Sequence, residues 1–412
     1  MLRTVAIGVA SAVLVAACAS PAQPATPSQG ASDATAPSAA SSGGPGRLVD
    51  IGQGRTMYLE CSGTGSPTIV LVSGLGERAD NWQITSRPED ADRAVYQQSA
   101  RVSRVCAYDR PGTETTTASG RAGSRSTPVP QPTSGTAAAN DLAAMLAASG
   151  EPGPYVLVGH SYGGIVIRLY AAAHPRSVAG LVFDDALSED LPTRLTSEQA
   201  ADLEKLNSPA VQGRPADAES VAFDVIFPEV RAIPSMPTVP TVVLSADRKV
   251  ISAEDIASGK LPPFVTQSFA DALWSAQLAA QDALAAKFPG ARHITATHAG
   301  HYIHVEQPKL VDDAIAGVHV RAAHRASGQR QIRLCQVSSV GRPPQARSRT
   351  QVGRRPWATA RTPQDRQNAS SSTVSISCSS SPPYSAALST TKPGNPSVLI
   401  AIVFAACCCS LV

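Results

Sequence analysis

The chain has 412 residues, of which 43% are hydrophobic, and its formal net charge is +3. Residues 321–412 contain eleven arginines and one lysine against one acid, Asp365, a net charge of +11, so the residues before them carry −8. The basic character therefore belongs to the end of the chain, and the acidic remainder gives no reason to expect a nucleic-acid partner.

The first eighteen residues have the pattern of a signal peptide. Arg3 precedes an apolar stretch, residues 5–17, that is too short to span a bilayer as a mature helix. Small residues directly before Cys18 resemble a bacterial lipobox, in which the cysteine is lipidated and becomes the new N-terminus; the alternative is ordinary cleavage near Ala19. We expect residues 1–18 to direct export and Cys18 to anchor the protein to the outer face of the bacterial cell membrane, or else the protein to be secreted.

A tether and one globular domain are expected to follow. Residues 19–46 are almost entirely Ser, Ala, Pro, Gly, Gln and Thr, a composition that cannot form a core and predicts a disordered tether. Residues 47–320 have about the length of one α/β domain. Within it, residues 136–149 have the apolar spacing of an amphipathic helix and are followed by Gly150.

A glycine-rich loop follows the first strongly apolar strand. Residues 68–72 (Thr-Ile-Val-Leu-Val) predict a buried strand, and residues 73–76 (Ser-Gly-Leu-Gly) form the loop after it. Glycine on both sides of Leu75 lets that backbone approach a substrate closely. The Leu75 N–H is therefore a candidate donor to an oxyanion.

The most specific motif is Gly-His-Ser-Tyr-Gly at residues 159–163, directly behind the apolar run at residues 155–158. Gly-x-Ser-x-Gly between a strand and a helix is the nucleophile elbow, a sharp turn that lifts the serine hydroxyl to the carboxyl edge of a sheet. A helical pattern continues to Ala173. We predict that Ser161 is the nucleophile and that the Tyr162 N–H is the second oxyanion donor; the alternative is a glycine-rich turn that only packs a helix on a strand.

An elbow serine needs a histidine base and an acid that orients it, and in enzymes with this elbow they follow in the order Ser, Asp or Glu, His. Residues 291–297 predict a final strand and Pro308 the start of a helix. The base should lie in the loop between them. We predict His301, with His298 and His304 as alternatives.

The orienting acid should follow an intermediate strand. Residues 240–245 have the pattern of a buried strand, and Asp247 follows at its end, between the serine and the histidine in the chain. The competitor is Asp185, in the aspartate pair that closes the preceding strand at residues 178–183. We predict Asp247, with Asp185 as the alternative; a solvated surface aspartate is the simpler interpretation of either.

The spacing His298-x-x-His301-x-x-His304 also suits a metal site. The stretch is predicted to be a loop rather than a helix that would align the rings, and no cysteine or carboxylate cluster in the sequence completes a site. We therefore predict neither a metal nor an organic cofactor.

Together these motifs resemble the α/β-hydrolase superfamily over about residues 55–320, most closely its secreted bacterial esterase-like members. Besides the elbow, the resemblance rests on the Ser-Gly-Leu-Gly loop, on Tyr-Asp-Arg-Pro-Gly at residues 108–112 and on Gly-His-Tyr-Ile at residues 300–303. It implies an α/β fold with a mostly parallel, eight-stranded sheet flanked by helices. It also implies an inserted cap, for which residues 187–236, with irregular helical patterns and several prolines, are the candidate.

The resemblance has departures and one further implication. Many relatives carry His-Gly where this chain has Ser73-Gly74, and a threonine-rich and Gly/Ser/Pro-rich stretch, residues 113–134, replaces the usual glycine and serine, which affects substrate shape more than chemistry. The family layout places Cys61 and Cys106 in its neighbouring second and fourth strands, which implies a disulfide after export. The alternative is two small buried hydrophobic residues.

The end of the chain changes character at residue 321. Residues 321–412 are basic and rich in Ser, Pro and Gln, with no lasting periodicity, so we expect a disordered tail. Binding to anionic lipid or nucleic acid is the alternative that its charge allows.

The function predicted from these residues is hydrolysis of a small carboxylic ester through an acyl-enzyme. An aminopeptidase-like member of the same superfamily is the first alternative, although no acidic anchor for a substrate amine can be located in the sequence. A non-catalytic lipoprotein that keeps the fold for binding is the second. The lipid anchor implies the membrane as a partner, and no oligomeric state is predicted.

Overall fold

The computed structural model describes residues 46–117 and 120–340, so the predicted signal peptide with Cys18, nearly all of the tether and the tail from residue 341 lie outside the described residues. Within them, eight strands form one sheet. In spatial order these strands are β1 (Arg47–Gly52), β2 (Arg55–Ser62), β4 (Val105–Tyr108), β3 (Thr68–Val72), β7 (Tyr155–His160), β8 (Val178–Asp184), β9 (Thr241–Leu244) and β10 (Arg292–Ile294). The pairs β1–β2 and β2–β4 are antiparallel and all other neighbours are parallel, which confirms the predicted mostly parallel sheet of eight strands.

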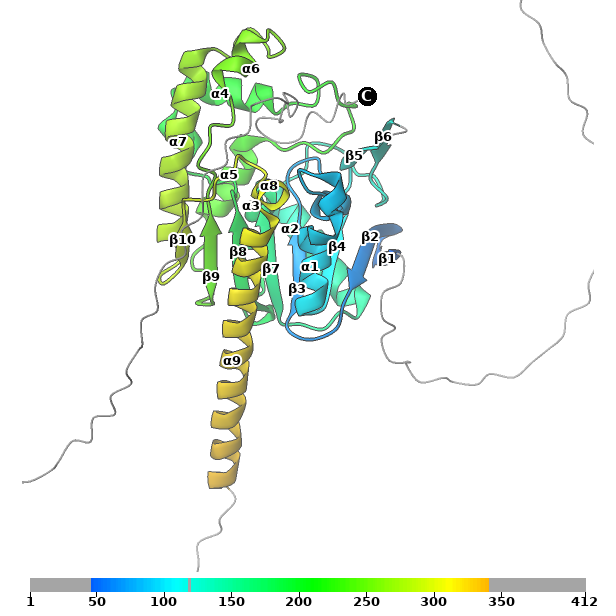
Figure 1. The fold of residues 1–412 in the computed structure, drawn as a ribbon. Helices are drawn as coiled ribbons and strands as arrows, with labels where there is room; N and C mark the ends of the chain where they lie inside the picture. Colours follow the sequence, from blue (N-terminus) through cyan, green and yellow to red (C-terminus); the bar gives the residue numbers. More distant parts are fainter. Residues whose placement is uncertain (1–45, 118–119, 341–412) are drawn as a thin grey trace, which may run out of the picture. The chain divides into compact units, whose positions relative to one another are not determined.

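Helices cover both faces of the sheet (Figure 1). The helices are α1 (Val95–Val102), α2 (Gly135–Ser149), α3 (Tyr162–Ala173), α4 (Ser197–Leu206), α5 (Phe223–Arg231), α6 (Ala253–Ala257), α7 (Gln267–Ala286), α8 (Ile303–Glu306) and α9 (Pro308–Val340). Helices α1 and α9 pack on one face and α2, α3 and α5 on the other. Alternate residues of β3 serve the two cores: Ile69 and Leu71 pack with α1 and α9, and Val70 and Val72 with the opposite helices.

Local signals in the sequence fix the helix that leads into the central strands. Helix α2 begins after Ser134, whose side chain accepts a hydrogen bond from the Ala137 N–H, and ends at Gly150 in the left-handed conformation. The predicted helix at residues 136–149 is therefore confirmed, with one additional residue at its start.

Two segments contain secondary structure that the sequence did not predict. The threonine-rich and Gly/Ser/Pro-rich stretch after Gly112 contains a hairpin, β5 (Glu114–Thr117) and β6 (Gly120–Gly123). Helix α9 continues to Val340, so residues 321–340 are helical rather than disordered. These residues include Ala, Gln and Arg and contain no proline, so their helix propensity outweighs their basic character.

The predicted cap lies between β8 and β9. Residues 187–236 contain α4 and α5 joined by irregular segments, as their interrupted helical pattern suggested. Among residues 46–117 and 120–340, none of the helices combines the length and hydrophobicity required of a transmembrane segment.

A disulfide connects the two antiparallel strands β2 and β4. Cys61 and Cys106 are directly paired in register, with their Cα atoms 4.1 Å apart, and their sulfur atoms are bonded. Cys106 is fully buried and Cys61 half-buried.

Candidate active site

Ser161 occupies the turn between β7 and α3. Its backbone has φ 52° and ψ −121°, a conformation that residues with a side chain rarely adopt. The neighbouring glycines leave room for this turn: a Cβ on Gly159 would lie 2.7 Å from the Gly163 carbonyl oxygen, and one on Gly163 would lie 2.2 Å from the Val72 carbonyl oxygen. The local geometry is therefore that of the strand-to-helix elbow, and larger residues cannot replace these glycines.

The Ser161 hydroxyl is buried at the carboxyl edge of the sheet. Its backbone N–H donates to the Asp184 carbonyl (3.2 Å), and its carbonyl accepts from the Leu187 N–H (2.8 Å). Within the described residues, its Oγ has no hydrogen-bond partner. Buried polar atoms are normally paired, so an unpaired hydroxyl at this turn makes Ser161 a candidate nucleophile.

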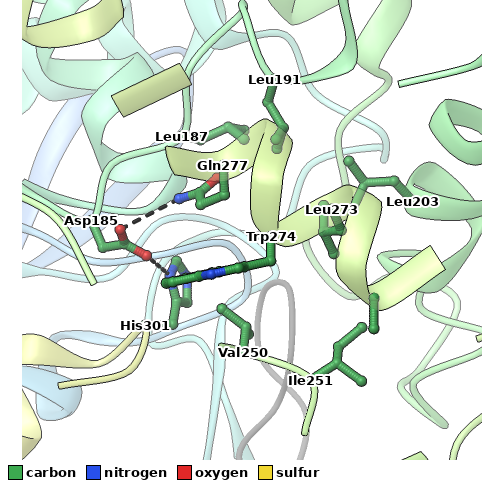
Figure 2. Close-up of a pocket in the computed structure, with 11 residues that line it drawn as sticks. Asp185, Leu187, Leu191, Leu203, Val250, Ile251, Leu273, Trp274, Gln277 and His301 are labelled. Atoms are coloured by element: carbon green, nitrogen blue, oxygen red, sulfur yellow. Dashed lines mark hydrogen bonds and ion pairs between the residues drawn. The ribbon is translucent and has the colours of Figure 1, made fainter. Parts of the chain in front are cut away.

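His301 lies on the same edge and is hydrogen-bonded to Asp185. The distance from His301 Nδ1 to Asp185 Oδ2 is 2.6 Å, and both side chains are buried (Figure 2). Burial alone would lower the pKa of His301, but the hydrogen bond and charge of Asp185 raise it above its usual value. With Nδ1 engaged by the carboxylate, Nε2 is the nitrogen that could accept a proton.

Asp185 is itself held in place. It follows β8 with a positive φ of 40°, and its Oδ1 accepts from the Ala246 N–H (3.0 Å) and from Gln277 Nε2 (3.4 Å; Figure 2). The carboxylate therefore has partners from the segment after β9 and from α7 as well as from His301.

The partner of His301 is thus Asp185 rather than Asp247, and the prediction that favoured Asp247 needs correction. The Asp247 carboxylate accepts from the backbone N–H groups of His298 (2.9 Å) and Ala299 (3.0 Å). It stabilises the start of the histidine-bearing loop, and this use of both oxygens explains why a carboxylate at the end of β9 does not orient the imidazole.

The three closely spaced histidines have different environments. The side chain of His298 is 83% exposed, whereas His304 is buried with its Nδ1 2.6 Å from Asp184 Oδ2. His301 is therefore the histidine paired with Asp185, while the consecutive aspartates Asp184 and Asp185 contact two histidines of the segment between β10 and α9.

One buried group has the composition of a metal site. His160, Asp184 and His304 bring their potential ligand atoms within 4.8 Å of one another. However, His304 is hydrogen-bonded to Asp184, and both ring nitrogens of His160 lie at hydrogen-bond distance from other acceptors. A metal ion would have to break these hydrogen bonds, so the arrangement fits a polar network better than a metal centre.

The predicted oxyanion donors lie in well-anchored segments. Tyr162 is the first residue of α3, so its N–H has no acceptor within the helix. Leu75 is buried between two anchored N–H groups: that of Gly74 donates to Glu77 (3.0 Å) and that of Gly76 to Glu219 (2.5 Å).

A buried ion pair also supports this loop. Arg110 pairs with Glu219 (2.6 Å) and donates to the carbonyl groups of Ser73 (2.9 Å) and Gly74 (2.5 Å). Sequence reasoning did not assign Arg110, Glu219 or Glu77; for Arg110 the available signal was its place in the Asp-Arg-Pro-Gly run after a strand.

An apolar pocket adjoins the His301–Asp185 pair (Figure 2). One wall comes from the predicted cap and the other from the segment between β9 and the middle of α7, which the sequence did not indicate as part of the site. The lining residues are Asp185, Leu187, Leu191, Leu203, Val250, Ile251, Ala270, Leu273, Trp274, Gln277 and His301. Apart from the ionisable pair and Gln277, which donates to Asp185, these side chains are apolar or, as in Trp274, aromatic.

Comparisons with known proteins address the fold. Residues 67–244 match the family model of the alpha/beta hydrolase fold. The chain is 32% identical over 161 residues to an uncharacterised protein of Schizosaccharomyces pombe, a match covering 34% of this chain and 28% of that protein. It is 30% identical over 148 residues to a Hormonema carpetanum protein named "Probable transporter efuK", a match covering 34% of this chain and 18% of that protein. The matches therefore span less than a third of either relative.

Among solved structures, a thermophilic esterase from Thermogutta terrifontis is similar, with a TM-score of 0.42 and 20% sequence identity, over 67% of this chain and 100% of that one. The family match and the strand order of the sheet give this chain the α/β-hydrolase fold.

Proposed function

We propose that the protein is a serine hydrolase that cleaves carboxylic esters, with Ser161 as nucleophile, His301 as base and Asp185 as orienting acid. Ser161 Oγ attacks the ester carbonyl carbon while His301 Nε2 takes its proton. The N–H groups of Leu75 and Tyr162 stabilise the negative oxygen of the tetrahedral intermediate. His301 then protonates the leaving alcohol, and a water molecule, deprotonated by His301, hydrolyses the acyl-enzyme.

The observation that carries the proposal is the combination of a buried serine hydroxyl at a positive-φ elbow with a His301–Asp185 hydrogen bond of 2.6 Å on the same sheet edge. Ser161 is directly preceded by His160, whose ring centroid lies 4.7 Å from that of His301. The hydrolase fold supports the same reaction class. This chemistry requires no metal or organic cofactor.

A fluorophosphonate probe and hydrolysis of p-nitrophenyl esters test the proposal together. The wild-type protein should be labelled at Ser161 and should hydrolyse a short ester. Ser161→Ala should abolish labelling and lower kcat by about 10³-fold or more without changing the thermal unfolding midpoint, because members of such a triad act as a unit. Labelling or undiminished hydrolysis in Ser161→Ala would contradict the assignment.

We also propose export and lipid anchoring through Cys18, a proposal that rests on the sequence of residues 1–18 alone. The wild-type protein should fractionate with membranes, and Cys18→Ser should remain unprocessed or appear in the soluble fraction. The same distribution of both forms would contradict the anchor.

A further inference from the structure

Glu77 is a nearly buried carboxylate whose contacts join its own loop to the nucleophile elbow. Its Oε2 accepts from the Gly74 N–H (3.0 Å) and from Asn81 Nδ2 (2.7 Å), and it lies 3.2 Å from His160 Nδ1. Gly74 precedes the candidate oxyanion donor Leu75, and His160 precedes Ser161. One oxygen atom therefore joins the oxyanion loop to the nucleophile elbow.

Three further hydrogen bonds extend this contact to the segment that carries His301 and His304. On one side, His160 Nε2 lies 3.1 Å from the His301 carbonyl oxygen. On the other side, Asn81 Nδ2 lies 3.1 Å from His304 Nε2, and His304 Nδ1 lies 2.6 Å from Asp184. We call Glu77, Asn81, His160, Asp184 and His304 the polar network.

Glu77 has the ionisation needed to hold several donors. Burial alone would raise its pKa, but the adjacent His160 and hydrogen bonds lower it to about 2. An ionised carboxylate forms stronger hydrogen bonds than a neutral amide, and in a buried site each of its donors would lose a partner if it were removed. Glu77 is positioned to keep the oxyanion loop and the histidine loop in a fixed relation.

We propose that Glu77 is a positioning residue that sets the distance between the oxyanion donors and His301, acting through Gly74 on one side and through His160 and Asn81 on the other. It touches no reacting atom. The inference rests on the proposed ester hydrolysis for its kinetic consequence, but the mechanical link between the two loops does not depend on that reaction.

Glu77→Gln tests the link, because the neutral amide oxygen is a weaker acceptor than the ionised carboxylate oxygen that these donors share. Backbone hydrogen exchange, followed by mass spectrometry, should become faster both in residues 73–76 and in residues 298–304. For ester hydrolysis, kcat per site titrated with fluorophosphonate should fall about 10–100-fold with KM within about threefold, since misplacement of about 1 Å can cost 10²-fold. Unchanged exchange in residues 298–304, or unchanged kcat per titrated site, would overturn the proposal.

Glu189→Gln is the matched control. Glu189 is also almost fully buried, has a pKa lowered to about 2 despite burial, and pairs with Arg168 (2.5 Å). Its replacement should lower thermal stability but leave kcat per titrated site and exchange in residues 298–304 unchanged. Equal kinetic losses in both variants would indicate general destabilisation and count against the proposal.

Asn81→Leu provides a second variant if Glu77→Gln does not fold. Asn81 is only half-buried, and its replacement removes the hydrogen bond to His304 while Gly74 and His160 keep their contacts with Glu77. Backbone hydrogen exchange should become faster in residues 298–304, and kcat should fall about 3–10-fold. No change in either quantity would overturn the role of the Asn81–His304 hydrogen bond. A wild-type protein without esterase activity would refute the proposed function, and hydrogen exchange would still decide the link.

Discussion

The polar network and the apolar pocket both contact His301, but they are built from opposite kinds of interaction. The network consists of side chains that are buried, apart from the half-buried Asn81, and their hydrogen bonds have defined partners at 2.6–3.2 Å. The pocket is lined mainly by Leu, Ile, Val and Trp side chains, which pack without directional partners. Hydrogen bonds fail when one partner is removed, whereas apolar contacts weaken in proportion to the surface lost.

The contrast indicates that the residues that hold the proposed catalytic groups differ from those proposed to select the substrate. The groups proposed to handle protons and charge are held by residues for which the sequence predicts no role, such as His160 and Glu77. The apolar side chains of the pocket come from the cap, from the segment after β9 and from α7, and we propose that they face the substrate. We therefore expect substitutions among the hydrogen-bonded groups to cause abrupt losses of activity. Substitutions in the pocket should cause graded losses of activity.

The largest effect should follow the loss of the Asp185 carboxylate. Asp185→Asn leaves His301 Nδ1 facing an amide and favours the wrong imidazole tautomer, a change that costs about 10⁴-fold in a serine protease triad. We expect a comparable loss in kcat on a short ester. Asp247→Asn is the matched control, since it weakens contacts to the His298 and Ala299 N–H groups and should reduce stability more than activity. If Asp185→Asn kept near-normal activity and Asp247→Asn lost most of its activity, Asp247 rather than Asp185 would be the orienting acid.

The next largest effect concerns the ion pair that supports the oxyanion loop. Arg110→Met leaves the Glu219 carboxylate buried without its cation, which should lower the free energy of unfolding by about 3–5 kcal/mol in urea denaturation. Lys309→Met, which breaks an exposed pair with Asp313 on α9, should change it by less than about 0.5 kcal/mol. Similar values for the two variants would contradict the structural importance of the Arg110–Glu219 pair.

Removing an aromatic side chain from the pocket should produce a smaller, substrate-dependent effect. Trp274→Ala should lower kcat/KM about tenfold for p-nitrophenyl esters with longer acyl chains and leave the acetate ester nearly unchanged, because only larger apolar groups reach that wall. Leu278→Ala, at an exposed position of the same helix, should alter neither. A uniform loss across chain lengths would place the pocket outside the substrate path.

The smallest effect is a shift in pH dependence. His301 accepts a proton only when neutral, so kcat/KM should fall as the pH drops through its pKa, which Asp185 raises. In Asp185→Asn, the residual activity should persist to lower pH than in the wild type. For stability the sign is opposite: because the folded pKa is raised, the contribution of this pair is complete at low pH and is lost as the pH rises through that pKa. If the fall of kcat/KM at low pH occurred at the same pH in the wild type and in Asp185→Asn, a group other than His301 would control it.

The sequence predicted those parts of the site that depend on neighbouring residues. The elbow is determined by glycines two positions either side of Ser161, and the loop around Leu75 by the strand before it. The mostly parallel sheet of eight strands and the neighbouring second and fourth strands followed from the resemblance rather than from the residues alone.

The orienting acid could not be chosen in the same way. Asp185 and Asp247 both follow buried strands, and their difference arises only in three dimensions. Asp185 takes a positive φ that directs its carboxylate to His301, whereas the oxygens of Asp247 are engaged by backbone N–H groups that become available once the loop has folded. Similarly, the contribution of α7 to the pocket depends on how a distant helix packs, which no local pattern encodes.

The disulfide between Cys61 and Cys106 has a consequence for recombinant production. The bonded residues are separated by 45 positions in the sequence. The segment that they enclose contains the oxyanion loop at residues 73–76 and the proposed positioning residue Glu77. In the chain-entropy model, closing a segment of this length lowers the conformational entropy of the unfolded chain and so stabilises the folded state by about 3–4 kcal/mol. Protein made in a reducing cytoplasm would lack this restriction, so expression with export to an oxidising compartment is the appropriate source for every measurement of activity or stability proposed above.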